Sequence, residues 1–322
     1  MKLSAFLQLK VNVFIYRNLR WKFAFFYLML LGKIYFHIKT TERKKIDNAL
    51  DTVFRRFDNS FDIKSITKRV FRGIISHYYE KLFNAYADIQ RLKAFFRINI
   101  KVNGLSKLDS LLKNGKGVLF VTAHYGGIEY IPIFLATNNY PISVILKFAT
   151  RQLEQTLHVQ TKDLGIKLIN VNEEKSVFQV ITRELKANRI VFIECDEVEE
   201  WKPSRKEHMS FLKKAIGVDK TINLILKRTG AEVIFGLMHR FSLKKYTLFL
   251  HSYEDILSRS HTAFSSIGEA LLKTLEQYIY SYPEQWYQWK NYMDIKAFPA
   301  YGAVLDTPAV VPLLKPAFSE VS

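Results

Sequence analysis

Hydrophobic positions recur at helical spacing along residues 42–98. Ile46, Leu50 and Val53 stand three and four residues apart, and the same steps return further along this section. Such spacing places an apolar stripe on one side of an α-helix, because one helical turn takes about 3.6 residues. The pattern predicts that this section is helical.

After residue 98 the rhythm changes to short apolar runs that alternate with amphipathic stretches. Strands joined by helical crossovers run parallel, and such a sheet is covered on both faces. The pattern therefore predicts an α/β fold with a mostly parallel mixed sheet flanked by helices. Strands are expected in GVLFVT, PISVILKFA, IKLINV, RIVFIECD and AEVIFGLMHRF, and helices in RQLEQTLHVQTKDLG, SVFQVITRELKAN and TINLILKRTG. KYTLFLHSYE is expected to add an antiparallel edge strand, and a last helix is expected to end near Pro283.

The first 45 residues combine an apolar run with strong positive charge. They hold ten Lys and Arg and one Glu, so that 10 − 1 leaves +9, half of the formal +18 of the chain. The uninterrupted apolar stretch from Phe23 to Gly32 is ten residues long, well short of the ~20 that span a bilayer as a helix. Its basic flanks suit a helix that lies in the headgroup region of an anionic membrane. We predict a basic, helical, membrane-associating segment over residues 1–45; a buried core helix and a short tilted insertion are the alternatives.

The rest of the chain is expected to form one α/β domain over residues 46–296 and a tail over residues 297–322. The last 24 residues contain four of the eight prolines and show no convincing periodicity, which is typical of a loosely attached terminus. The single cysteine, Cys195, excludes an intrachain disulfide and is interpreted as a small buried hydrophobe. The chain contains no GxSxG, phosphate-binding glycine loop or GxGxxG motif, which argues against several common enzyme classes.

The stretch GVLFVTAHYGGIEYIPIFLA carries the strongest chemical signal. His124 follows a predicted strand, at the edge where open α/β sheets place their ligands, and Glu129 stands in the first turn of the next helix. Gly126 and Gly127 allow a sharp turn and the close approach of a substrate. A carboxylate bound to one imidazole nitrogen makes the other a better proton acceptor. We interpret His124 and Glu129 as a dyad that activates a hydroxyl or amine; a histidine satisfied within a loop and a glutamate at a helix start are the structural alternative.

HYGGIE resembles the His-x4-acid box of glycerolipid acyltransferases, and specifically the HFGNWE form found in bacterial lipid A biosynthesis acyltransferases. The likeness extends over about residues 40–292. YPEQWYQW resembles the C-terminal PEQWxW motif of that family, and RKKIDNALDTVF resembles its N-terminal helix. ECDEVEEWKP followed by FLKKAIG resembles its aspartate segment and FFG, and LILKRTGAEVIFGLMHR resembles its helix, turn and strand. The resemblance implies a glycerolipid acyltransferase-like fold.

The resemblance also implies roles for individual residues. His124 would be the general base and Glu129 its orienting partner. Asp196 matches the aspartate of the family and Arg240 matches the basic residue at the end of the later strand. Arg151 is the candidate for the basic residue that follows the strand after the box. These three are assigned to substrate binding. The alternative for each arginine is a solvated surface charge, and for Asp196 it is one of several acidic residues of a loop.

Gly126 and Gly127 complete the expected site, because backbone amides near them, or an arginine, are the candidate donors to an oxyanion. The chain also departs from the family pattern. Gly127 and Ile128 replace the Asn-Trp of the box, and Phe211 and Leu212 replace a pair of aromatic residues. The acceptor therefore need not be a lipid A precursor.

The expected activity is the transfer of a fatty acyl chain from a thioester of acyl carrier protein or coenzyme A to a hydroxyl or amine of a membrane lipid or glycolipid. The thioester is a co-substrate, and neither metal nor other cofactor is expected. The expected partners are the lipid acceptor, acyl carrier protein and the anionic membrane surface, at the cytoplasmic face of the bacterial inner membrane. No nucleic-acid-binding motif is evident. The alternative is a catalytically inactive, basic peripheral membrane or nucleic-acid-binding protein on the same scaffold.

Overall fold

The computed structural model describes residues 7, 9–19, 21–54, 62–146, 148, 151–198, 204, 206–260 and 263–298. The tail expected over residues 297–322 lies almost wholly outside these residues.

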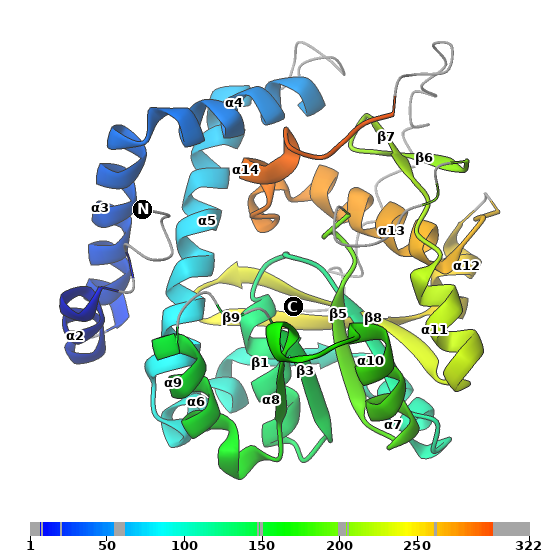
Figure 1. Ribbon diagram of the computed structural model, residues 1–322. Helices are drawn as coiled ribbons and strands as arrows, with labels where there is room; N and C mark the ends of the chain where they lie inside the picture. The colour runs from blue at the N-terminus through cyan, green and yellow to red at the C-terminus, as the bar shows by residue number, and fades with distance from the viewer. Residues whose placement is uncertain are drawn as a thin grey trace.

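A seven-stranded sheet forms the centre of the molecule (Figure 1). Its strands in spatial order are β1 (Ile100–Asn103), β9 (Lys245–Ser252), β8 (Glu232–Ser242), β2 (Val118–Thr122), β5 (Ile190–Glu194), β3 (Ile142–Leu146) and β4 (Lys167–Asn170). β8, β2, β5, β3 and β4 pair in parallel, whereas β9 runs antiparallel to β8. The α/β fold and the mostly parallel mixed sheet are thus confirmed.

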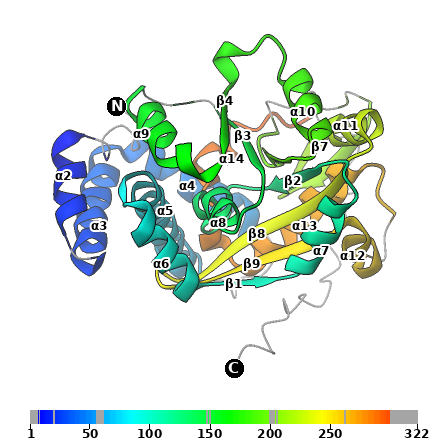
Figure 2. The same ribbon diagram turned by 90° about the horizontal axis from the view of Figure 1, so that it is seen from below.

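One prediction about the sheet is wrong. β9 is antiparallel as expected, but it is not an edge strand, because β1 pairs with it in parallel on its other side. Figure 2 shows β1 and β4 at the two ends of the sheet. The four residues of β1 are too short a run to reveal their partner, which lies well over a hundred residues further along the chain.

Helices cover the sheet as the alternation predicted. All five residues of β2 are buried, which is typical of a central parallel strand with both faces covered. The helices between and after the strands are α7 (Leu105–Lys113), α8 (Ile131–Thr137), α9 (Arg151–Thr161), α10 (Val177–Lys186), α11 (Thr221–Thr229), α12 (Tyr253–Arg259), α13 (Ile267–Ser281) and α14 (Trp289–Tyr292). Single 3₁₀ turns are η1 (Ile128–Tyr130), η2 (Lys162–Leu164), η3 (Val171–Glu173) and η4 (Pro283–Gln285).

The chain before the sheet is helical, as its periodicity predicted. Its helices are α2 (Lys10–Asn18), α3 (Trp21–Ile38), α4 (Thr40–Phe54), α5 (Ile63–Tyr86) and α6 (Ile89–Asn99). α5 packs directly against η1 and η4, which carry the histidine box and the C-terminal motif. Gly73 permits this approach, because a Cβ atom there would lie 1.9 Å from the carbonyl oxygen of Glu284. α5 is therefore one wall of the region around His124.

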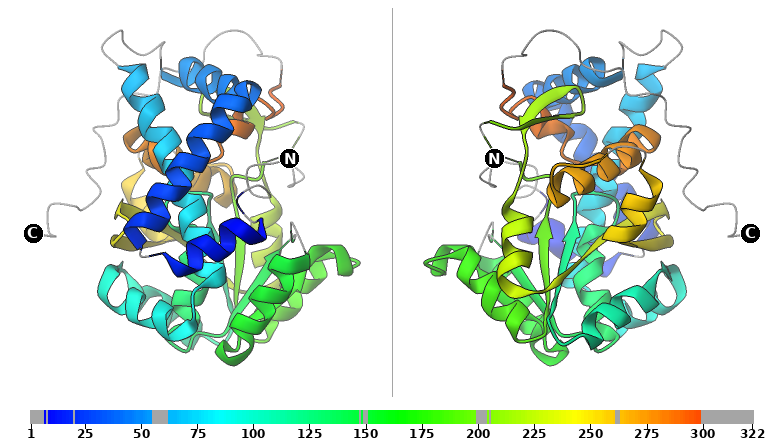
Figure 3. Two further views of the ribbon diagram at one scale, coloured as in Figure 1. Left: turned by 90° about the vertical axis from the view of Figure 1, so that its left-hand side faces the viewer. Right: turned by 90° about the vertical axis from the view of Figure 1, so that its right-hand side faces the viewer.

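α3 presents apolar side chains on two opposite sides. Ala24 and Leu28 are buried, and the helix contacts α5; the left view of Figure 3 shows α3 in front of α5. Phe26 and Leu30 point outwards and remain 70% and 48% exposed. One side of α3 is thus a core contact, as the buried-helix alternative predicts, and the other side is open to solvent. Within the described residues, no helix meets the length and hydropathy that a membrane crossing requires.

A small hairpin of β6 (His208–Phe211) and β7 (Lys214–Gly217) was not predicted. Its two turn residues, Leu212 and Lys213, have φ of +47° and +67°. Hairpin turns of this kind normally use Asn or Gly, so Leu-Lys lacks the usual sequence signal. The turn is stabilised from outside, because the carboxylate of Glu276 accepts a hydrogen bond from the Leu212 amide and the Tyr292 hydroxyl donates to the Leu212 carbonyl. Cys195, elsewhere in the core, is buried as expected.

Candidate active site

His124 lies just beyond the carboxyl end of β2, beside the segment that follows β5. The two strands are parallel neighbours, and Thr122 pairs with Glu194 in their register. Two further residues along each chain bring His124 level with Asp196. The backbone confirms this, because the His124 amide donates to both carboxylate oxygens of Asp196, at 3.2 and 3.1 Å.

The side chains of His124 and Asp196 are also bonded to each other. Nδ1 of His124 lies 3.0 Å from Oδ1 of Asp196, whose side chain is fully buried. Nε1 of Trp286 donates to the other carboxylate oxygen at 2.8 Å. Asp196 is thereby held in place, and it fixes the imidazole with Nε2 as the atom that faces the site.

The expected pairing of His124 with Glu129 is not what the structure shows. Glu129 lies in η1 and turns towards α5, where its Oε1 is 3.2 Å from Nζ of Lys81 and 3.6 Å from Nε2 of His77. The chain between His124 and Glu129 explains this orientation, because Tyr125 and Gly126 form bridges to distant segments and lead the loop away from the imidazole. The carboxylate on His124 is that of Asp196.

Opposing effects act on the acidity of His124. Burial lowers the pKa of its imidazole, but the charges of Asp196, Glu194 and Glu197 outweigh burial and raise the pKa to about 9. The ring is therefore a stronger base than ordinary imidazole, and it holds a proton at neutral pH when no ligand is bound. It must release that proton from Nε2 before it can accept another.

The glycine amides of the box are not available to an oxyanion. The Gly126 amide donates to the carbonyl of Gln285 at 2.8 Å, and the Gly127 amide donates to the carbonyl of Met238 at 2.9 Å. Our expectation that these two amides serve as donors is wrong, because two distant segments of backbone occupy them. Gly126 itself is required for packing: its φ is +56°, and a Cβ atom would lie 1.9 Å from the Met238 carbonyl oxygen. Both glycines shape the loop that positions His124.

Arg240 is buried, and it supports the loop of the histidine box from behind. Its guanidinium binds both carboxylate oxygens of Glu80 on α5 and donates to the Gly126 carbonyl at 2.8 Å. Gln285 also bonds both the amide and the carbonyl of Arg240. Arg240 lies near the box, as the resemblance implied, but α5 and the C-terminal motif bury it. Its visible role is to hold the backbone of the box.

Arg151 occupies a different environment. It is the first residue of α9, its side chain is exposed, and within the described residues it forms no hydrogen bond or ion pair. The structure therefore does not bring Arg151 into contact with His124 or Asp196.

The sequence interpretation missed Tyr287, which belongs to the C-terminal motif. Its ring stacks on His77 with 3.5 Å between the centroids and meets the His124 ring edge-on at 4.9 Å. Its amide donates to the His124 carbonyl at 3.2 Å. Burial raises the pKa of Tyr287 well above its usual value, so the hydroxyl is neutral, and it has no hydrogen-bond partner among the described residues. The ring of Tyr287 therefore lies beside the imidazole, and its hydroxyl is neutral.

His77 and Lys81 of α5 were also missed. They stand four residues apart, a spacing that places both on one face of a helix. Burial lowers the pKa of His77, while Glu129 raises the pKa of Lys81. The helical spacing was a usable signal, but only the packing of α5 against η1 shows that this face meets the histidine box.

Two more acidic residues surround the free side of His124. Glu194 ends β5 and Glu197 follows Asp196, with Oε1 of Glu197 3.7 Å from Nε2 of His124. One ligand atom each of His124, Glu194 and Glu197 lie within 4.8 Å of one another. These three are the described side chains that could hold a metal ion.

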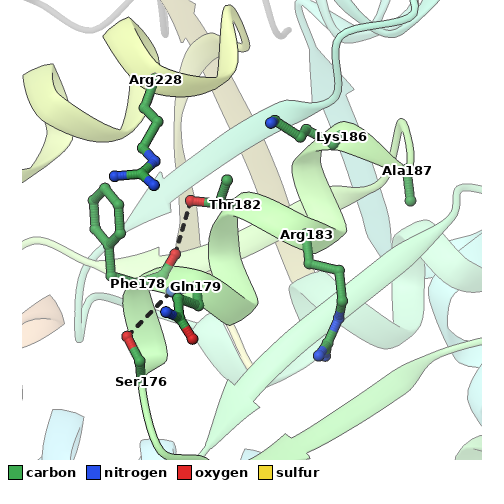
Figure 4. A pocket seen from close by; sticks show the side chains of 8 residues that line it. All are labelled: Ser176, Phe178, Gln179, Thr182, Arg183, Lys186, Ala187 and Arg228. Carbon is green, nitrogen blue, oxygen red and sulfur yellow. Dashed lines mark hydrogen bonds between the residues drawn. The ribbon is translucent and has the colours of Figure 1, made fainter.

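A separate pocket of about 650 Å³ lies between α10 and α11 (Figure 4). Arg228 stands over the ring of Phe178 there, with 5.6 Å from its Cζ atom to the ring centroid. The lining residues are Ser176, Phe178, Gln179, Thr182, Arg183, Lys186, Ala187 and Arg228. None of them belongs to the site around His124.

Comparison with known families identifies one match. The family described as bacterial lipid A biosynthesis acyltransferase matches residues 10–291. A comparison with curated proteins finds no match. The family match covers most of the chain and includes the box, the segment after β5 and the C-terminal motif, which the fold brings together around His124. The chain belongs to the bacterial lipid A biosynthesis acyltransferase family and is an acyltransferase.

Proposed function

We propose that this acyltransferase moves a fatty acyl group from a thioester of acyl carrier protein or coenzyme A to a hydroxyl or amine of a membrane lipid or glycolipid. The observation that carries the proposal is the bond between His124 and Asp196 at the carboxyl end of the central strands. Asp196 occupies Nδ1, so Nε2 is the nitrogen that can accept a proton once it has released the one that it holds at neutral pH. The family itself implies a lipid acceptor and an acyl donor.

The reaction balances without a cofactor. Nε2 of His124 accepts the proton of the acceptor, and the acceptor oxygen or nitrogen attacks the carbonyl carbon of the thioester. The carbon–sulfur bond then breaks, and the imidazolium returns its proton to the leaving thiolate. The products are an ester or amide and a free thiol.

The tetrahedral intermediate needs a donor for its oxyanion. We assign this role to the hydroxyl of Tyr287, which is neutral and belongs to a ring that meets the His124 ring edge-on. A neutral O–H donor in a buried site stabilises developing negative charge without reorganising water. Glu129 and Lys81 form the adjoining wall, where the two side chains are paired with each other.

We further propose that the outer side of α3 contacts the membrane. Members of the family are typically membrane-associated in bacteria. An exposed apolar stripe runs along α3, where each residue is 44–70% exposed: Phe23, Phe26, Leu30 and Ile34. The N-terminal basic residues would face anionic lipid, and the net charge of +18 would also favour an acidic carrier protein. Such a helix would lie at the cytoplasmic face of the inner membrane.

The decisive experiment measures acyl transfer by the full chain with acyl carrier protein and coenzyme A donors across lipid acceptors. In the His124→Ala variant the rate is expected to fall by about 10²- to 10⁴-fold, with membrane association unchanged. If the wild type transfers no acyl group from either donor but still binds membranes, the inactive binding protein is the better description. Mass spectrometry of lipids from cells with and without the gene would identify the acceptor.

A further inference from the structure

We propose that His124, Glu194 and Glu197 form a binding site for a divalent transition-metal ion, with Zn²⁺ as the best fit, and that the ion excludes His124 from catalysis. The binding itself does not depend on the proposed reaction. The inhibitory consequence does rest on the proposed function of His124 as a base.

The spacing of the candidate ligands supports a metal. Nε2 of His124 and Oε1 of Glu197 are 3.7 Å apart, which is longer than a hydrogen bond. Two ligands that each lie 2.0–2.1 Å from a tetrahedral Zn²⁺ are about 3.4 Å from each other. A ligand atom of Glu194 completes a set within 4.8 Å. Small side-chain rotations would bring all three atoms to one ion.

The surroundings of His124 are those of a metal-binding histidine. Such a histidine usually donates its second ring N–H to a carboxylate, which fixes the tautomer and raises the basicity of the ligating nitrogen. Asp196 accepts this bond at 3.0 Å, and Trp286 holds Asp196 from the far side at 2.8 Å. Nε2 is thereby the nitrogen directed at Glu197.

Charge and access also favour a cation. Asp196, Glu194 and Glu197 lie around His124, while the ammonium group of Lys81 is paired with Glu129. The side chains of His124 and Glu197 are 12% and 35% exposed, so an ion can enter from solvent. One imidazole and two carboxylates suit Zn²⁺, whereas Mg²⁺ prefers six oxygen ligands in octahedral geometry. The fourth zinc position would remain open to water.

Metal binding and proton transfer at His124 would exclude each other. The same lone pair of Nε2 cannot bind Zn²⁺ and accept a proton from the acceptor. A bound ion would therefore hold the enzyme in an inactive form until it is removed, and the reaction itself needs no metal.

The binding arm of the test uses ZnCl₂ and the full chain. Calorimetry and zinc analysis after dialysis are expected to find one Zn²⁺ per chain. His124→Ala and Glu197→Gln should each weaken binding by more than about 100-fold, and Asp196→Asn by about 10- to 100-fold. His158→Gln, which removes an exposed histidine of α9, is the matched control and should bind as the wild type does. Circular dichroism and thermal unfolding establish that each variant is folded, and Glu197→Gln preserves side-chain shape if His124→Ala does not fold.

X-ray absorption of the zinc complex should show one nitrogen and two carboxylate groups as ligands. Absence of stoichiometric binding, or binding that Glu197→Gln leaves unchanged, would overturn the proposal. In the activity arm, Zn²⁺ should inhibit acyl transfer by the wild type and a chelator should restore it. If the wild type transfers no acyl group, the binding arm still decides the metal site, so the two failures are distinguishable.

Discussion

Nδ1 of His124 lies 3.0 Å from Oδ1 of Asp196, although the two residues are 72 positions apart in the chain. They meet because β2 and β5 are parallel neighbours whose register continues beyond their last paired residues. The base that we propose for this acyltransferase is thus assembled from two strand ends, and Glu129 of the same box lies on a neighbouring wall.

Replacement of Asp196 tests this assignment. Asp196→Asn keeps the side-chain shape but removes the charge that stabilises the imidazolium, so kcat for acyl transfer should fall by about 10²- to 10⁴-fold. Glu129→Gln is the matched control and should reduce kcat less, because Glu129 contacts Lys81 and His77. A larger loss in Glu129→Gln than in Asp196→Asn would show that Glu129 orients the base during turnover.

The hydroxyl of Tyr287 can be removed without loss of its ring. Tyr287→Phe keeps the stacking on His77 and should lower kcat by about 10²-fold, the usual cost of one oxyanion donor, with little change in the KM for the acceptor. Steady-state kinetics on both substrates provide the measurement. An unchanged kcat would remove Tyr287 from the proposed mechanism.

Arg240 is expected to matter through stability. Arg240→Met leaves the buried carboxylate of Glu80 without its guanidinium, and the loss of one partner of a buried ion pair costs about 3–5 kcal/mol. Urea unfolding should show this loss in the free energy of unfolding. Combining Arg240→Met with Glu80→Gln should recover part of it, because the uncompensated charge is removed. A fully stable Arg240→Met variant with impaired substrate binding would instead support the original assignment to the substrate.

The lowered pKa of His251 predicts that the fold loses stability in acid. Burial, with a smaller contribution from Arg259, lowers the pKa of His251 from 6.5 to about 4, and its Nε2 is paired with the Tyr278 hydroxyl at 3.0 Å. The unfolded chain therefore takes up the proton first, so the stabilisation is complete above pH 6.5 and declines as the pH falls towards 4. At pH 5 the free energy of unfolding should be lower than at neutral pH by about 2 kcal/mol.

The His251→Gln variant retains a polar partner for Tyr278 but does not titrate. The difference between its free energies of unfolding at pH 7 and pH 5 should be smaller than that of the wild type. Part of the difference should remain, because burial also lowers the pKa of His239, to about 3. An identical difference in variant and wild type would contradict the assignment to His251.

The exposed stripe of α3 can be tested with lipid vesicles. Phe26→Ser combined with Leu30→Ser removes apolar surface that is already open to solvent, so the fold should remain while affinity for anionic vesicles falls by at least about tenfold. Ile98→Ser is a suitable control, since Ile98 is 75% exposed on α6, away from this stripe. Equal vesicle binding by the double variant and the wild type would rule out this face of α3 as the contact.

Local patterns along the chain were enough to predict the elements and the position of the histidine. The alternating strands and helices, the helical section before them and the placement of His124 at a strand end all depend on neighbours close in sequence. The hairpin turn at Leu212 and Lys213 escaped prediction because its unusual backbone is held by Glu276 and Tyr292, which come from much later in the chain.

The sequence by itself determined the α/β class, the excess of basic charge near the N-terminus and the position of His124 at the end of a central strand. Only the tertiary structure decided which carboxylate binds His124, that the amides of Gly126 and Gly127 are already occupied, and that Arg240 is buried against Glu80. The physical reason is that periodicity reports the local backbone, whereas strand neighbours, hydrogen-bond partners and burial are created when distant segments pack together.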